Sequence, residues 1–193
     1  MPDPVPGPLS GPLLWTLPTA ASTRALGVAL GQLLCAGDLL VLTGDLGAGK
    51  TTLAQGLGEG LGVRGPITSP TFVIARVHPS LVGGPALVHV DAYRLGGGLE
   101  LDDLDLDTSL AESVTVVEWG HGVAELLSGD RLELVLEAAP PAAGTLRPAE
   151  LDLTAEADSG ERRATLTPTG PRWQRPDAVE ALASLTSTVL PGG

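Results

Sequence analysis

The sequence is poor in positive charge. It has 11 lysine and arginine residues among 193, and Lys50 is the only lysine. Its formal net charge of −12 at pH 7 argues against a broad basic surface that holds a nucleic-acid backbone through many phosphate contacts. If RNA is involved, we expect another protein to hold it. Because Lys50 lies in a different motif, no lysine is left for the N/T-K-x-D motif with which ordinary GTPases read guanine.

Cysteine and long apolar segments are also scarce. The single cysteine, Cys35, has no partner for an internal disulfide, which is typical of a protein in a reducing cytoplasm. It lies in an apolar stretch with helical spacing, and we predict that it is buried. No apolar run approaches the length that spans a bilayer, and the first residues lack the basic and apolar regions of a signal peptide. We therefore expect a cytoplasmic protein.

The sequence does contain a complete phosphate-binding loop, G-x-x-x-x-G-K-T. It reads Gly44-Asp45-Leu46-Gly47-Ala48-Gly49-Lys50-Thr51 and is followed by Thr52. Glycines let backbone N–H groups point at an anion, the lysine reaches the β- and γ-phosphates, and the threonine hydroxyl binds Mg²⁺. An apolar run at 38–43 precedes the loop, and residues 51–57 can begin a helix whose N-terminal dipole attracts phosphate. The motif predicts a nucleoside triphosphate site.

The hydrophobic pattern predicts an α/β fold with a mixed sheet, in which central parallel strands and additional antiparallel strands are flanked by helices. We expect strands at 13–17, 38–43, 72–77, 86–90, 114–117, 131–136, 150–154 and 162–167. The strands at 72–77 and 86–90 are expected to form an antiparallel hairpin. Helices are expected from Ser22-Thr23 to about 34, at 51–61 and at 123–127. The acidic segment 99–110 fits a helix or long loops equally well, and 138–147 reads as a surface connection.

Two carboxylates stand at the ends of apolar strands. Asp91 follows 87–90, and Glu118 follows 114–117. In phosphate-loop enzymes this position places an acid beside Mg²⁺, and either residue could bind the ion while the other orients the attacking water. A single acid at a strand end is as often a capping or solvent-exposed residue. Two such acids after a phosphate loop favour a functional role.

A short polar segment, Thr68-Ser69-Pro70-Thr71, lies between the loop and these strands. Many phosphate-loop proteins carry at this place a loop that responds to the γ-phosphate. The alternative interpretation is a simple capped turn. Thr68, Ser69 and Thr71 are therefore candidate residues of a switch-like loop.

Four blocks of the sequence together resemble the TsaE (YjeE) family. They are Gly44–Thr52, Thr68–Phe72, His89-Val90-Asp91-Ala92-Tyr93-Arg94-Leu95 and Val117-Glu118-Trp119-Gly120, in the order and at the spacing of the family. The resemblance implies an ATPase that works with TsaB and TsaD in forming threonylcarbamoyladenosine at position 37 of tRNA. In that family a partner transfers the threonylcarbamoyl group, and ATP hydrolysis supports repeated turnover. Contact with tRNA is then expected through the partners.

The resemblance also implies roles for individual residues. Residues 47–52 would bind the phosphates of ATP, Thr51 and Glu118 would hold Mg²⁺, and Asp91 would act at the reacting end of the nucleotide. Trp119 would pack beside the site, although core packing is an equal alternative. His89 and Tyr93 would position the Asp91 strand, and a structural role of His89 is favoured over a catalytic one. Arg162 or Arg163 is a candidate for an arginine of the last strand of the family.

Two other classes of function use the same loop. A small-molecule kinase should add a lid with several arginines, and Arg94 is the only arginine within a motif here. A nucleotide-sensing module would bind Mg·ATP without appreciable hydrolysis and present a surface to its partners. For the domain organisation we expect a disordered Pro/Gly-rich tail at 1–12, one P-loop ATPase domain at 13–171 and a C-terminal extension at 172–193.

Overall fold

The computed structural model describes residues 11–70, 74–94, 110–120, 122, 127–139 and 160–189. The strands are β1 Leu13–Leu17, β2 Leu39–Thr43, β3 Ala75–His78, β4 Ala86–Asp91, β5 Ser113–Glu118, β6 Arg131–Ala138 and β7 Arg162–Thr169. The helices are α1 Ala20–Leu33, α2 Lys50–Leu61 and α5 Pro176–Val189, with 3-10 turns η1 Ala92–Arg94 and η3 Pro171–Gln174. None of the described helices is long and apolar enough to cross a membrane.

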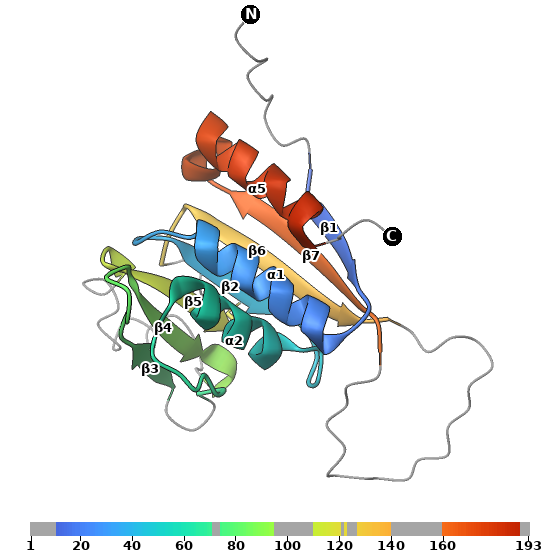
Figure 1. Ribbon diagram of the computed structural model, residues 1–193, viewed down its shortest axis with the longest axis horizontal. Coiled ribbons are helices and arrows are strands. Elements are labelled where there is room, and N and C mark those ends of the chain that lie inside the picture. Colours follow the sequence, from blue (N-terminus) through green and yellow to red (C-terminus); the bar gives the residue numbers. More distant parts are fainter. Residues whose placement is uncertain are drawn as a thin grey trace, which may run out of the picture.

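The strands form one mixed sheet with the order β1-β7-β6-β2-β5-β4-β3 (Figure 1). Its centre is parallel, because β2 pairs with β5 and β6, and β4 pairs with β5, all in parallel. β7 runs antiparallel to β6 and β1, and β3 runs antiparallel to β4. β2 and β5 are buried on both faces, which explains their continuous apolar sequences. The predicted mixed α/β sheet and the β3–β4 hairpin are confirmed.

The helices α1, α2 and α5 lie on one side of the sheet (Figure 1). Their apolar side chains share a core with alternate residues of the strands, including Leu40 and Leu42 of β2. The other face carries a smaller cluster that includes Leu39 and Val41. This alternation follows from the two-residue period of a strand. The helix expected from Ser22-Thr23 begins slightly earlier, because Thr19 and Ser22 form a capping box at its N-terminus.

Two predictions about local structure are wrong. Cys35 is exposed rather than buried, because α1 ends at Leu33 and the chain then turns toward β2. The strand expected at 72–77 begins only at Ala75, since Ile74 has a φ of 68°, in the left-handed region, which interrupts an extended strand.

Other predicted segments lie wholly or largely outside the described residues. They are the tail at 1–12, the acidic segment at 99–110, the helix at 123–127, the connection at 138–147 and the strand at 150–154.

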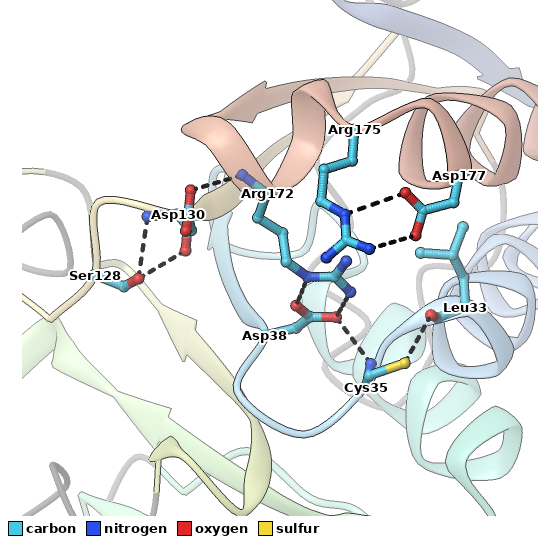
Figure 2. Close-up of polar contacts among 8 residues, drawn as sticks. All are labelled: Leu33, Cys35, Asp38, Ser128, Asp130, Arg172, Arg175 and Asp177. Atoms are coloured by element: carbon cyan, nitrogen blue, oxygen red, sulfur yellow. Dashed lines mark hydrogen bonds and ion pairs between the residues drawn. The ribbon is translucent and has the colours of Figure 1, made fainter. Parts of the chain in front are cut away.

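The segment after β7 joins the main core. Trp173 and Leu182 are buried in the same cluster as α1 and α2. Arg172 makes a two-point ion pair with Asp38, with Nε–Oδ1 and Nη2–Oδ2 distances of 2.6 and 2.8 Å, and its backbone N–H donates to Asp130 at 3.0 Å (Figure 2). Asp38 is buried and also accepts the backbone N–H of Cys35. The pair therefore links the turn before β2 to the start of the C-terminal segment.

We expect Asp38→Ala to lower the free energy of unfolding by about 2 kcal/mol, because it leaves Arg172 without its partner and frees the N–H of Cys35. Thermal and denaturant unfolding will measure the loss. Asp177→Ala is the matched control, since Asp177 pairs with Arg175 at the surface, where both side chains are more than 60% exposed (Figure 2). That control should change stability by only a few tenths of a kcal/mol. Equal losses in the two variants would contradict the special role of the Asp38 pair.

Candidate functional site

The phosphate-binding loop connects the carboxyl end of β2 to the N-terminus of α2. A Cβ atom on Gly44 would overlap the carbonyl oxygen of Leu136, so only glycine fits there. Gly49, the residue before α2, has a φ of 103° and has no side chain to cap the helix. The first N–H groups of α2 therefore face the loop without a side-chain cap. This is the arrangement that binds an anion at a helix N-terminus.

The Lys50 ammonium group is held beside this loop. Its Nζ donates to the carbonyl oxygens of Gly44 at 2.7 Å and Asp45 at 3.0 Å, and it lies 3.9 Å from the centre of the Trp119 ring. Burial lowers the pKa of Lys50 from its ordinary value, while the charges of Glu118, Asp91 and Asp45, in that order, oppose the shift. The ammonium group is thus placed between the loop and the carboxylates.

Asp91 and Glu118 are brought together by the sheet. They are register partners at the carboxyl ends of β4 and β5, and β5 is the direct neighbour of the loop strand β2. Both residues are buried, at 4% and 2% exposure. The Asp91 carboxylate accepts the backbone N–H of Tyr93 at 3.0 Å. The Glu118 carboxylate lies 2.8 Å from His89 Nε2.

A cavity of about 590 Å³ lies between the loop and the two strand ends. It is lined by Leu46, Gly47, Gly49, Lys50, Thr51, Thr52, Ser69, Asp91, Tyr93, Glu118 and Trp119. Most of the residues singled out from the sequence therefore surround one space. Its volume is of the size that accommodates a small molecule.

Several candidate residues lie beside this cavity rather than in its wall. Ala48 is buried in the core, and Gly44 and Asp45 contribute carbonyl oxygens to Lys50. Thr68 is exposed and accepts a hydrogen bond from Arg76. Thr71 falls outside the described residues. Of the candidate switch-like loop, only Ser69 is seen to line the cavity.

Aromatic and apolar side chains form the rim of the cavity. The rings of Tyr93 and Trp119 are 5.3 Å apart, and Tyr93 is 67% exposed. Trp119 has a φ of 59°, an uncommon conformation for this residue, and lines the cavity. Leu46 is 95% exposed. Sequence reasoning missed Leu46, although an apolar side chain within a phosphate loop was a signal that could have identified it.

A second, smaller hollow of about 70 Å³ lies on another side of the loop. Arg162 lines it together with Gly47, Gly49, Thr52 and the first turn of α1. The Arg162 guanidinium approaches the carbonyl oxygen of Gly47 at 3.5 Å. Of the two arginines considered from the sequence, the structure places Arg162 beside the loop.

The donor set of the main cavity suits magnesium. No group of three or more His, Cys, Asp or Glu side chains that could hold a metal ion occurs in the described part of the chain. Thr51 and Glu118 nevertheless line the same cavity. One hydroxyl group and one carboxylate, completed by phosphate oxygens and water, form a set of oxygen ligands that Mg²⁺ accepts. These residues fit an ion that arrives with a nucleotide.

Comparison with known proteins agrees with this architecture. Residues 17–143 match the family described as Threonylcarbamoyl adenosine biosynthesis protein TsaE. A Streptomyces coelicolor protein named tRNA threonylcarbamoyladenosine biosynthesis protein TsaE is 57% identical over 155 residues, which cover 80% of this chain and 95% of the relative. A Bacillus subtilis protein of the same name is 38% identical over 126 residues, covering 65% and 77%.

A solved structure extends the likeness to three dimensions. The crystal structure of Bacillus subtilis YdiB superposes with a TM-score of 0.64 and 29% sequence identity. The match covers 91% of this chain and 94% of that one, and so extends beyond the family match. Fold, sequence and motif order agree, and the chain belongs to the TsaE family.

Proposed function

We propose that this protein is a Mg²⁺-dependent ATPase that supports the formation of threonylcarbamoyladenosine at position 37 of tRNA. It acts with TsaB- and TsaD-type partner proteins, and its hydrolysis of ATP allows repeated turnover of the modification. The observation that carries the proposal is the convergence of Lys50, Thr51, Asp91 and Glu118 on one cavity at the N-terminus of α2. Family membership supports the role in tRNA modification.

The positions of these side chains suit phosphoryl transfer to water. Lys50 is poised to exchange its two carbonyl contacts for phosphate oxygens, which accept charge-assisted hydrogen bonds. Thr51 and Glu118 would hold Mg²⁺, which neutralises charge on the β- and γ-phosphates when bound. Asp91, the neighbour of Glu118, would orient the attacking water. The acidic chain supports a role in which partners hold the tRNA.

We expect Glu118→Gln to reduce kcat for ATP hydrolysis by about 100-fold, because the amide no longer supplies a negative charge at the metal. Its melting temperature should stay close to that of the wild type, since glutamine keeps the shape of the side chain. Glu112→Gln is the matched control, because Glu112 is exposed at the opposite end of β5. Steady-state hydrolysis and thermal unfolding of both variants test the prediction. Wild-type turnover of Glu118→Gln would contradict it.

The function itself is tested by measuring ATP hydrolysis with and without purified TsaB, TsaD and substrate tRNA. We expect slow turnover alone and faster turnover with the partners. Unchanged turnover together with ATP-dependent assembly would instead show a nucleotide-sensing module. Transfer of the γ-phosphate to a small molecule would show a kinase.

A further inference from the structure

We propose that His89 is a positioning residue that orients the Glu118 carboxylate toward the metal site. This inference rests on the proposed function, and it assigns a role to a side chain that does not line the cavity itself. Its basis is a buried contact of 2.8 Å between His89 Nε2 and Glu118 Oε1, in which the two side chains are 0% and 3% exposed.

The strands impose this contact. His89 and Asp91 are two residues apart on β4, so their side chains lie on the same face of the sheet. Glu118 is the register partner of Asp91 on β5, and it projects toward that face as well. The face is the one covered by the helices, since Leu87 belongs to the larger core cluster. The imidazole therefore sits directly behind the carboxylate, within the protein.

The hydrogen bond to Glu118 shows which nitrogen of His89 carries a proton. An ionised carboxylate only accepts, so Nε2 must carry the proton that bonds to Oε1. Nδ1 is buried and has no hydrogen-bond partner among the described residues. The geometry thus places a proton on Nε2.

This bond leaves one oxygen of Glu118 for the cavity. With Oε1 held by His89, Oε2 is the oxygen left for the cavity, which Glu118 lines together with Thr51 and Lys50. Hydrogen bonds of this kind orient metal-binding carboxylates, and their loss typically lowers metal affinity 10- to 100-fold.

Two substitutions of His89 distinguish the effect of losing the hydrogen bond from the effect of losing side-chain volume. Glutamine reaches about as far as Nε2 and can still donate to Glu118, whereas asparagine is too short. We expect His89→Asn to raise the Mg²⁺ concentration for half-maximal binding of a non-hydrolysable ATP analogue by about tenfold, and His89→Gln to restore most of the affinity. Calorimetry measures this without any turnover. His78→Asn is the matched control, because His78 is a buried histidine on the neighbouring strand β3 that bonds to the carbonyl oxygen of Arg64.

The Glu118→Gln background tests whether His89 acts through Glu118. Adding His89→Asn to Glu118→Gln should produce no further loss of Mg²⁺ affinity, while independent effects would add. Unchanged Mg²⁺ dependence in a folded His89→Asn variant, or additive losses in the double variant, would overturn the inference. A wild-type protein that binds no nucleotide would instead overturn the proposed function.

A measurement on the unaltered protein covers the case in which His89→Asn does not fold. The chain has three histidines, so the imidazole nitrogens can be assigned by NMR. We expect His89 to carry a proton on Nε2. A ring protonated on Nδ1 alone could not donate to Glu118 and would refute the proposed orientation.

Discussion

Replacing Lys50 with alanine is expected to weaken the binding of Mg·ATP by about 100-fold or more. The ammonium group is the only side-chain cation seen to line the main cavity in the described structure, and charge-assisted hydrogen bonds to phosphate contribute about 1.5–3 kcal/mol each. Calorimetric titration with Mg·ATP and Mg·ADP measures the loss. The fold should persist, because the substitution removes a buried charge whose partners are carbonyl oxygens of the loop itself.

Two further variants sharpen this test. Lys50→Arg should not restore binding, because the planar guanidinium cannot replace a compact ammonium group between the loop and Trp119. Arg24→Ala removes one positive charge from an exposed pair with Glu59 and should leave nucleotide affinity unchanged. Wild-type affinity in Lys50→Ala would contradict the assignment of this loop as the triphosphate site.

The second large effect is expected in the packing of α1 against α2. Gly27 and Gly31 of α1 face Gly56 and Gly60 of α2, and the two backbones touch. A Cβ atom on Gly27 would overlap the carbonyl oxygen of Leu53, so the helices would have to separate. Because α2 begins at Lys50, that displacement would also reach the phosphate loop.

We expect Gly27→Ala to lower the free energy of unfolding by about 3 kcal/mol, the upper range for overpacking in a core. Helix propensity alone would favour alanine over glycine by about 1 kcal/mol, so the sign of the change identifies its cause. Gly129→Ala is the control, because a Cβ atom there meets no atom within 4 Å. Denaturant unfolding of both variants provides the measurement. A stabilised Gly27→Ala protein would show that the helices do not require this close approach.

Much of the site could be predicted from local sequence. The loop at 44–51 has a fixed spacing, and the apolar runs before Asp91 and Glu118 identify strands whose carboxyl ends share one edge of the sheet. The structure confirms those strands and places both acids in register. The exposure of Cys35 could not be predicted in the same way, because it depends on where α1 ends rather than on residue type.

The sequence by itself determined the phosphate loop, the positions of most strands along the chain and the family, since all three depend on residue spacing along the chain. Only the tertiary structure decided which groups that are far apart in the sequence come into contact. It placed His89 behind Glu118, Arg172 on Asp38, and two helices in contact through their glycines. Each of these contacts joins residues at least 26 positions apart in the sequence. The two polar contacts form because a polar group that is removed from water needs a hydrogen-bond partner. The two helices touch because their backbones can approach closely only where side chains are absent.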